Sequence, residues 1–360
     1  MRKKKVVHVI GHLGKGGDST AVFNIMNYIE NNNENIEFDF ITHNGFDDNK
    51  LESIKEKHKV YIIENDARKM NPIKYYSKIF NILKKNKYDC IHFHTSFQSC
   101  LGLIAAKMNG VKVRICHSHT SDVQRKCNIV SRLAILPICK VFIELFSTEK
   151  VACSKEAAKN LFINRKNVKI IYNGIDINKI KSTNEEKIER IKKQIKYAEN
   201  DILIGHVGRF SDMKNQNFTL ELAEINQDKK FIFLGEGENF SFIKKKVEDL
   251  KLKNVYLLGK VDNVQDYMKL FDFLVLPSKY GEGLPITLIE EQIANKNCLC
   301  IVNSNISKEA NIGNVIYVDI KEKDKWNSII NKPKETKEEE NDYSLFDINL
   351  TSKMWLDLYL

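Results

Sequence analysis

The sequence of 360 residues lacks any uninterrupted apolar run of 18 residues, which is about the length that a membrane-spanning helix requires. It also lacks the pattern of a secretory leader. The basic residues after Met1 run directly into Val6–Ile10, which is too short for a signal core and has the composition of a strand. We therefore expect a cytoplasmic protein without a transmembrane helix.

The spacing of zinc-binding cysteines is absent as well. Eight cysteines are present, mostly within apolar segments, and only Cys298 and Cys300 lie close together in the sequence. A zinc pair has two or more intervening residues, whereas this single-residue spacing predicts two side chains on one face of a strand. We expect reduced thiols in the core and no cysteine-held metal.

Positive charge is concentrated in the first half of the chain. Residues 1–181 carry 31 Lys or Arg against 17 Asp or Glu, a balance of +14, and the remaining residues have a balance of −4. This asymmetry indicates an anionic partner for the first half. No Arg-rich recognition helix or aromatic RNA platform is present, so nucleic acid is not expected, and an anionic membrane face fits better. A general drift toward lysine and asparagine is the alternative explanation.

Apolar runs of strand length alternate with segments of helix length along the chain. In the first half the strand candidates are Val6–Ile10, Phe38–Thr42, Val60–Ile63, Cys90–Phe93, Val113–Cys116 and Lys150–Ala152. The alternation begins again at Ile202–Val207. The pattern predicts an α/β protein with two doubly wound parallel sheets.

Leu276–Glu291 is the most specific stretch of the sequence. Phe271–Leu276 predicts a buried strand, a Gly- and Pro-rich loop follows, and Ile286–Ala294 has helical spacing. The free amides at such a helix start suit phosphate or sugar oxygens. Glu282 and Glu290, separated by seven residues, could accept hydrogen bonds from hydroxyls. A helix-stabilising charge and a solvated glutamate would explain an isolated pair equally well.

In this setting Glu282 and Glu290 resemble the E-x7-E signature of the family-4 retaining glycosyltransferases of the GT-B fold. Arg209 and Lys214 lie at a strand-to-helix turn, where they could clamp a diphosphate or pair with local acids such as Asp212. The spacing of this cation pair from the two glutamates matches the family. The resemblance implies that Arg209 and Lys214 hold the donor diphosphate, that Glu290 binds the ribose, and that Glu282 contacts the donor sugar.

The resemblance implies further donor contacts from loops. The glycine-rich segment after the first strand looks like the loop with which this family opens, which would place Gly16 and Gly17 near the donor phosphates. Taken alone, a structural tight turn explains this segment as well. Val261 lies where the family's backbone meets the nucleotide base, and Gly283 and Leu284 belong to the donor loop.

Three histidines lie at or just beyond the ends of predicted strands, namely His94, His117 and His119. Ligands of open α/β sheets collect beyond the carboxyl ends of strands. Metal ligation is one interpretation, but no acidic third ligand is evident and single-residue spacing is a poor chelate pattern. The resemblance implies that His119 hydrogen-bonds the donor sugar or its phosphate, and we expect His94 and His117 on the acceptor side. A capping role without catalysis is the alternative for His119.

The resemblance also implies an architecture of two Rossmann-like domains that face each other across a cleft. Residues 1–180 would bind the acceptor, residues 181–344 would bind the nucleotide sugar, and a terminal helix over 345–360 would cross back to the first domain. The Asn-Gly-Ile-Asp tetrapeptide at 173–176 matches the family's interdomain segment.

The implied function is a retaining, metal-independent hexosyltransferase without a cofactor. It would move a hexose or N-acetylhexosamine from a nucleotide diphosphate sugar, a UDP-sugar, to a saccharide or lipid-linked acceptor in capsular or exopolysaccharide synthesis. The alternatives are a nucleotide-sugar epimerase or a phosphorylase of the same architecture, and a non-catalytic nucleotide-sugar-binding protein. No site for the pyridoxal phosphate of a phosphorylase is evident.

The segment 128–146 is strongly apolar with basic residues at its edges. A pair of core helices is the simplest interpretation, and an amphipathic segment against a membrane surface is the other.

Overall fold

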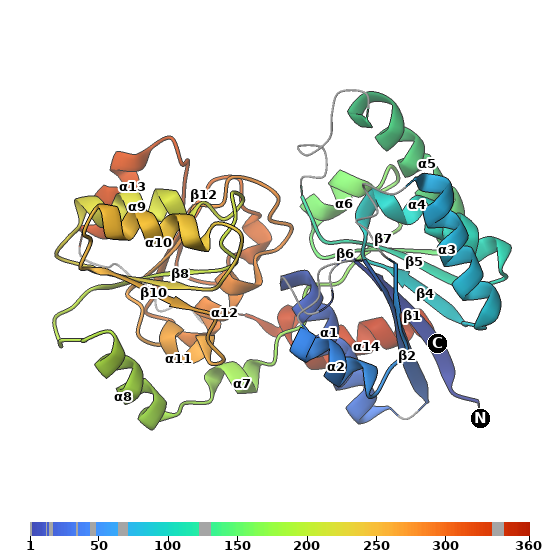
Figure 1. Cartoon of the computed structure of the whole chain (residues 1–360), viewed down its shortest axis with the longest axis horizontal. Coiled ribbons are helices and arrows are strands. Elements are labelled where there is room, and N and C mark those ends of the chain that lie inside the picture. Colours follow the sequence, from blue (N-terminus) through green and yellow to red (C-terminus); the bar gives the residue numbers. More distant parts are fainter. Residues whose placement is uncertain are drawn as a thin grey trace. The chain divides into compact units, whose positions relative to one another are not determined.

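The computed structural model describes residues 2–11, 13, 17–33, 35–43, 48–63, 71–121, 131–332 and 342–360. The chain divides into two compact units (Figure 1). The first unit consists of residues 1–175 and 344–360, and the second consists of residues 176–343.

The first unit contains a sheet of seven strands in the order β3-β2-β1-β4-β5-β6-β7, with every pair parallel. Its strands are β1 (Lys4–Ile10), β2 (Ile36–Thr42), β3 (Val60–Ile62), β4 (Cys90–Phe93), β5 (Val113–Ser118), β6 (Glu149–Ala152) and β7 (Val168–Ile170). The last five residues of β1, all of β4 and the last four residues of β5 are buried, as expected of a sheet that is covered on both faces.

Helices cover both faces of this sheet. They are α1 (Gly17–Asn32), α2 (Asp48–Lys55), α3 (Pro72–Lys85), α4 (Ser99–Met108), α5 (Leu136–Phe146), α6 (Lys155–Leu161) and α14 (Ile348–Tyr359), with short helical turns η1 (Ser96–Gln98), η3 (Ser131–Ile135) and η5 (Ser344–Phe346). α1, α2 and α14 lie on one side, and α3, α4 and α5 lie on the other (Figure 1). Ser154 caps α6, since its side chain accepts a hydrogen bond from the Ala157 amide.

The second unit contains six parallel strands in the order β10-β9-β8-β11-β12-β13. They are β8 (Leu203–Val207), β9 (Lys230–Leu234), β10 (Val255–Gly259), β11 (Phe273–Leu276), β12 (Leu299–Asn303) and β13 (Val315–Val318). The helices are α7 (Ile177–Lys181), α8 (Glu185–Gln194), α9 (Gln216–Ile225), α10 (Phe240–Asp249), α11 (Val264–Met268), α12 (Ile286–Ala294) and α13 (Lys323–Ile330), with the turn η4 (Lys308–Ala310). α9, α10 and α13 lie on one side of the sheet, and α11 and α12 lie on the other (Figure 1).

The predicted α/β class with two doubly wound parallel sheets is confirmed. α12 begins and ends at the residues that the helical spacing predicted. Two edge strands, β7 and β13, had no prediction. β7 is only three residues long and has Lys169 at its centre, so it produces no apolar run. β13 reads Val-Ile-Tyr-Val, an apolar run that sequence reasoning passed over.

The terminal helix α14 belongs to the first unit, as predicted. It packs against α1, and Trp355, Leu358 and Tyr359 enter the same apolar core as β1 and β2. Lys4 Nζ donates to the carbonyl oxygens of Tyr359 and Leu360, at 3.1 and 2.8 Å. Among the described residues, none of the helices has the length and apolar content needed to cross a bilayer.

Candidate functional site

The order in which strands are added to the second sheet reverses between β8 and β11. These strands are hydrogen-bonded neighbours, but the connections that follow them run toward opposite edges of the sheet. Open α/β sheets form their ligand crevice beyond the carboxyl ends of the strands at such a point. Arg209 and Lys214 follow β8, and Glu282 follows β11. Three of the predicted donor residues therefore extend from the two loops that flank the reversal.

The loop between β8 and α9 is held in shape by its own helix. Gln216 Oε1 accepts from the Ser211 amide at 3.2 Å, and Gln216 Nε2 donates to the Arg209 carbonyl oxygen at 2.9 Å. Asn215 adopts the left-handed conformation, with φ 58° and ψ 46°, and its Nδ2 donates to the Pro277 carbonyl oxygen at 3.2 Å. This last bond ties the loop after β8 to the loop after β11.

Two glycines after β9 support the same loop from the other side. Gly235 and Gly237 have φ values of +129° and +157°. A Cβ atom on Gly235 would lie 2.1 Å from the Gly208 oxygen, and one on Gly237 would lie 2.3 Å from the Phe210 oxygen. Only glycine lets the two backbones approach this closely, so the Gly-Glu-Gly turn fixes the position of the segment that carries Arg209.

Lys214 and Glu282 form the central ion pair of this site. Lys214 Nζ lies 2.5 Å from Glu282 Oε1, and the two side chains are only 12% and 10% exposed. Ser278 Oγ donates to the same Glu282 oxygen at 2.8 Å. Two charges held this close and largely out of water are strongly oriented. The structure thus brings together one predicted cation and one predicted carboxylate.

The Arg209 guanidinium pairs with Glu238, a residue that sequence reasoning missed. Nη2 lies 2.9 Å and Nε 3.1 Å from Glu238 Oε2, and both side chains are about half exposed (54% and 53%). Exposed ion pairs of this kind are worth little. Arg209 is therefore held loosely where an anion could replace the glutamate.

Glu290 lies on the fifth residue of α12 and is half-buried. Burial raises the pKa of Glu290 to about 7, against the opposing positive charge of Lys179. The next residue, Glu291, is completely buried, and burial followed by the neighbouring Cys298 raises the pKa of its carboxyl well above the ordinary range. Of the adjacent glutamates, Glu290 is the one that a ligand can reach.

His206 on β8 is a second residue near this site that the sequence did not single out. It is fully buried, and its Nδ1 lies 2.7 Å from Thr219 Oγ1. Burial, followed by the charge of Lys214, lowers the pKa of His206 to about 3. The His206 ring is therefore neutral and adds no charge to the site.

The remaining predicted donor residues are distributed over several loops. Gly283 and Leu284 are buried in the loop before α12, and Val261 is partly exposed just after β10. Gly17 is the first residue of α1 in the first unit. Gly16 lies outside the described residues.

The predicted histidines of the first unit belong to a larger cluster, in which the structure joins His94, His117 and His119 to His8 on β1 and His92 on β4. All except His119 are buried. Burial is the main reason that the pKa of each buried ring is lowered, for His8 to about 3. His94 and His117 therefore lie inside the fold rather than at a surface where an acceptor would bind.

Two sets of three histidines in this cluster have nitrogen atoms close enough to share a metal ion. They are His8, His92 and His94, and His94, His117 and His119, with the atoms of each set within 4.8 Å of one another. Neutral imidazole is a ligand for zinc and similar ions. The sequence signal for this cluster was the His-x-His pattern on two adjacent strands, which places alternate residues on one face.

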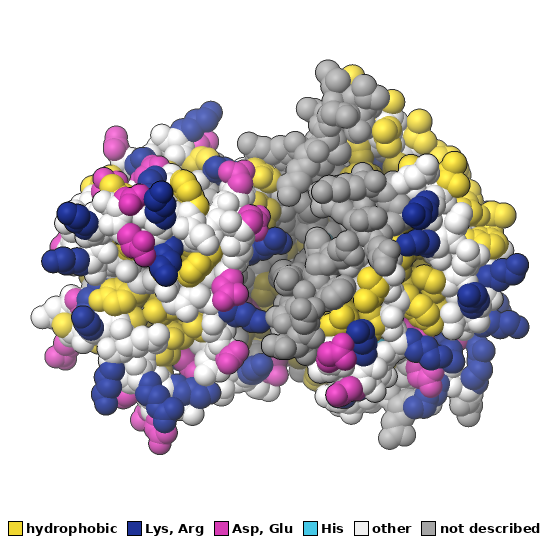
Figure 2. Space-filling model, in the orientation of Figure 1, with side chains coloured by type: hydrophobic (Ala, Val, Ile, Leu, Met, Phe, Trp, Pro, Cys, Tyr) yellow, Lys and Arg dark blue, Asp and Glu magenta, His cyan; other side chains and the backbone are white. Residues whose placement is uncertain are grey.

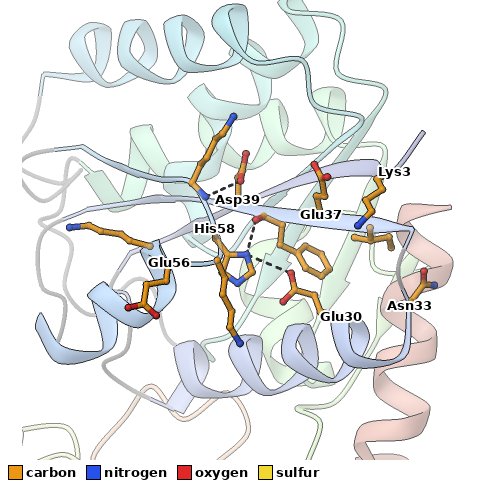
Figure 3. Close-up of a pocket in the computed structure, with 12 residues that line it drawn as sticks. Lys3, Glu30, Asn33, Glu37, Asp39, Glu56 and His58 are labelled. Atoms are coloured by element: carbon orange, nitrogen blue, oxygen red, sulfur yellow. Dashed lines mark hydrogen bonds and ion pairs between the residues drawn. The ribbon is translucent and has the colours of Figure 1, made fainter. Parts of the chain in front are cut away.

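A separate cavity of about 740 Å³ lies in the first unit, beside the amino-terminal ends of β1, β2 and β3 (Figure 3). Glu30 points toward His58 across it, with 3.5 Å between Glu30 Oε1 and His58 Nδ1, and His58 Nδ1 also lies 3.0 Å from the Phe38 oxygen. Four lysines and four carboxylates line it. The cavity has no preference for one sign of charge and lies away from the carboxyl ends of the strands, so we do not assign it to the site.

The chain is similar to known glycosyltransferases. A family model described as Glycosyltransferase Family 4 matches residues 15–179, and one described as Glycosyl transferases group 1 matches residues 187–344. The capsular polysaccharide biosynthesis glycosyltransferase CapH of Staphylococcus aureus is 29% identical over 378 aligned positions, which cover 99% of this chain and 98% of CapH. The UDP-Gal:alpha-D-GlcNAc-diphosphoundecaprenol alpha-1,3-galactosyltransferase of Escherichia coli is 29% identical over 244 positions, 61% of this chain and 59% of that enzyme.

A solved structure extends the likeness to the whole fold. The crystal structure of HepE from Anabaena in complex with UDP and glucose has a TM-score of 0.76, with 18% identity and coverage of 98% of both chains. At this identity the comparison shows the fold, which is the predicted arrangement of two Rossmann-like domains.

Proposed function

Because the chain belongs to the family-4 glycosyltransferases of the GT-B fold, we propose that it transfers a hexose or N-acetylhexosamine from a UDP-sugar to a saccharide or lipid-linked acceptor. The product would be a surface polysaccharide or its lipid-linked precursor, as the printed names of the S. aureus and E. coli relatives suggest. The observation that carries this proposal is the Lys214–Glu282 pair at the strand-order reversal of the second sheet.

The charges of the second unit suit a departing diphosphate. Lys214 is already oriented by Glu282 and needs no reorganisation as negative charge develops, which is the condition for a large electrostatic contribution. Arg209 can exchange Glu238 for a phosphate in a bidentate contact. We assign Glu282 to a hydroxyl of the donor sugar and Glu290 to the ribose hydroxyls. His119 of the first unit is assigned to the donor sugar.

We further propose retention of configuration without a metal ion. The bond between the anomeric carbon and the diphosphate oxygen breaks with its electron pair on oxygen, and the acceptor hydroxyl attacks from the same face. The hydroxyl proton passes to the departing phosphate oxygen. The two cations, Arg209 and Lys214, supply the charge neutralisation that a metal ion supplies in other transferases.

The experiment is a donor-turnover assay with a panel of UDP-sugars, monitored by nuclear magnetic resonance. We expect slow release of UDP without acceptor, an α-linked product from an α-linked donor when acceptor is present, and no effect of EDTA. Conversion of the donor to a second UDP-sugar would identify an epimerase instead. A β-linked product or inhibition by EDTA would contradict the corresponding part of the mechanism.

We also propose that the first unit contacts an anionic membrane surface. The inward side of α5 is buried at Leu136, Cys139 and Ile143. The opposite side and the preceding turn η3 leave large apolar side chains exposed, namely Leu133, Ile135, Ile138, Val141 and Leu145. Figure 2 shows apolar side chains gathered on the flank around α5. An apolar stripe on a basic unit matches the chemistry of a lipid interface.

Sedimentation with lipid vesicles tests this surface. Wild type should bind phosphatidylglycerol vesicles and bind pure phosphatidylcholine more weakly. The double variant Ile138→Asp with Leu145→Asp should lose most of the binding. Ile225→Asp, at a similarly exposed position (57%) on α9 of the second unit, is the control. Equal losses in the control and the double variant would contradict the assignment.

A further inference from the structure

The helices α4 and α5 lie side by side on one face of the first sheet (Figure 1), and each contributes a cysteine to their contact. Cys100 is the second residue of α4, and Cys139, 39 positions later in the sequence, is the fourth residue of α5. Their Sγ atoms lie 3.3 Å apart, with the Cys100 thiol as the donor, and neither cysteine is in a disulfide. The fold therefore places two thiols from separate helices in direct contact.

The two helices stay in contact well beyond the cysteines. Lys107 follows Cys100 by about two helical turns, and Phe146 follows Cys139 by the same distance. Lys107 Nζ lies 5.0 Å from the centre of the Phe146 ring. The Phe146 carbonyl oxygen also accepts a hydrogen bond from Arg114 Nε of β5, at 2.7 Å. α5 is thus fixed against α4 and against the sheet at its carboxyl end, so the approach of the two thiols does not depend on a single contact.

The distance between the two sulfur atoms is close to what a disulfide requires. A disulfide has an S–S bond of about 2.05 Å, so the two Sγ atoms would have to approach each other by about 1.3 Å. Each Sγ atom moves when its side chain rotates about the Cα–Cβ bond. Shared between two side chains, this movement takes rotations that are small compared with the roughly 120° between rotamers. The bond can therefore form without separating or unwinding the helices.

The two thiols differ in reactivity. The hydrogen bond between them lowers the pKa of Cys139, which accepts it, and raises the pKa of Cys100, which donates it. The thiolate is the form that attacks an oxidant. Cys139 is also 8% exposed, the largest exposed fraction among the cysteines that the structure describes, and Cys100 follows with 5%. Cys139 is therefore the thiol that a small oxidant reaches first.

We propose that Cys100 and Cys139 are a redox pair that hydrogen peroxide converts to a disulfide between α4 and α5. The Cys139 thiolate attacks the peroxide, so a sulfur–oxygen bond forms while the oxygen–oxygen bond breaks, and the thiol proton leaves with the departing hydroxide as water. The Cys100 sulfur then attacks the sulfenic acid of Cys139, the S–S bond forms, and a second water leaves. Two thiols and one peroxide give one disulfide and two water molecules, and an added dithiol reverses the reaction.

The disulfide would stabilise the first unit. It would close a covalent loop from Cys100 to Cys139 that contains the whole of β5 and the start of α5. Closing a loop of this size reduces the freedom of the unfolded chain. It would also tie α5, the helix with the exposed apolar side chains, covalently to α4. None of this depends on the proposed transfer reaction.

The first test is mass spectrometry of the full chain after treatment with a small molar excess of hydrogen peroxide. We expect the intact mass to fall by two hydrogen atoms. Peptide mapping without reduction should identify a cross-link between Cys100 and Cys139, and dithiothreitol should remove it. Cys90→Ala, which deletes another buried thiol of the first unit, is the matched control and should keep the cross-link. Cys127→Ala should keep it as well.

Single variants of the pair separate the two roles. In Cys100→Ala the sulfenic acid of Cys139 has no resolving thiol, so dimedone should label Cys139. In Cys139→Ala, Cys100 should stay unlabelled and reduced. The absence of any cross-link in the wild type would overturn the proposal, as would a cross-link that joins Cys139 to another cysteine. Dimedone labelling of Cys100 in Cys139→Ala, at the rate seen for Cys139, would contradict the assignment of the attacking thiol.

Thermal unfolding provides a second readout. Trp355 belongs to the core of the first unit, and its fluorescence reports on that unit in a Trp326→Phe background. Oxidation should raise the melting temperature by about 5–10 °C, and dithiothreitol should reverse the rise. The same treatment of Cys139→Ala should produce no rise. A rise of equal size in that variant, or none in the oxidised parent chain, would contradict a stabilising link between α4 and α5.

Discussion

Both units contain a parallel sheet whose strand order reverses, but the side chains at the point of reversal differ in kind. In the first unit the reversal lies between β1 and β4, and neutral, buried histidines occupy it. In the second it lies between β8 and β11, and the Lys214–Glu282 ion pair flanks it. The fold determines where a ligand can bind. The side chains at that place determine whether the ligand meets neutral hydrogen-bonding groups or charged groups.

The difference follows from how each reversal is covered. α14 closes over the histidines of the first unit with Trp355 and Tyr359, so water is excluded and charge is disfavoured. In the second unit the charged groups are on loops beyond the strand ends, where a counter-charge or a ligand can compensate them. The second arrangement suits an anionic ligand, whereas the first keeps its histidines neutral and inside the fold.

Removing the central cation should have the largest effect. Lys214→Ala deletes the oriented charge that we assign to the departing diphosphate, so kcat for donor turnover should fall by about 10²- to 10³-fold, as when one preorganised electrostatic contact is lost. Lys279→Ala is the control. Lys279 also pairs with a carboxylate at 2.5 Å, Asp212, but in a more exposed position of the loop after β11, and turnover should change less than 3-fold. Similar losses in both variants would remove the special role of Lys214.

Placing a charge in the core of the first unit should have the next largest effect, and this effect is on the stability of the fold. His8→Asp introduces a carboxylate at a completely buried position, and the cost of an uncompensated buried charge is on the order of 3 kcal/mol. His8→Asn, which keeps the site neutral, should cost about 1 kcal/mol. Urea unfolding can be monitored by Trp355 fluorescence in a Trp326→Phe background, because these are the only two tryptophans of the chain. Equal costs for the two variants would show that charge is not what the first unit excludes.

Sequence reasoning was strongest where periodicity and loop chemistry coincide. The strand, glycine-rich loop and helix around Glu282 could be predicted because burial, turn residues and helical spacing all change within a few residues. The Arg209–Glu238 pair could not be predicted, because the two residues belong to different strand-to-helix turns and no spacing rule connects them. The same holds for Tyr359, whose partners are contributed by strands more than 260 residues earlier.

The site residues themselves remain proposals, and Glu290 offers a test through pH. Because burial raises the pKa of Glu290 to about 7, the carboxyl is largely protonated at pH 6 and ionised at pH 8. An ionised carboxylate accepts ribose hydroxyls better, so the affinity for UDP should rise up to about 10-fold over this range. Glu290→Gln should abolish the rise, and Glu248→Gln on α10 should keep it. Isothermal titration calorimetry measures both.

The same shift predicts the sign of a stability effect. A carboxyl whose pKa is higher in the folded state than the ordinary 4.5 binds its proton more tightly when folded. Its contribution to the free energy of unfolding is therefore greatest at low pH and is lost as the pH rises from about 4.5 through 7. Glu290→Gln should remove this decline. If the decline persists in the variant, the group that titrates near pH 7 is not Glu290.

The smallest effect is expected where the second unit already tolerates an exposed charge. Glu238→Ala frees the Arg209 guanidinium from a half-exposed ion pair, which is worth a few tenths of a kcal/mol, so the melting temperature should barely change. The freed guanidinium no longer has to exchange a carboxylate for phosphate, and UDP should bind about 2- to 3-fold more tightly at low ionic strength, with the gain disappearing in high salt. Glu221→Ala, which breaks the ion pair with Lys323 elsewhere in the second unit, should leave UDP binding unchanged. Weaker binding in Glu238→Ala would mean that Glu238 holds Arg209 in its binding position, and that the second unit uses orientation as well as charge.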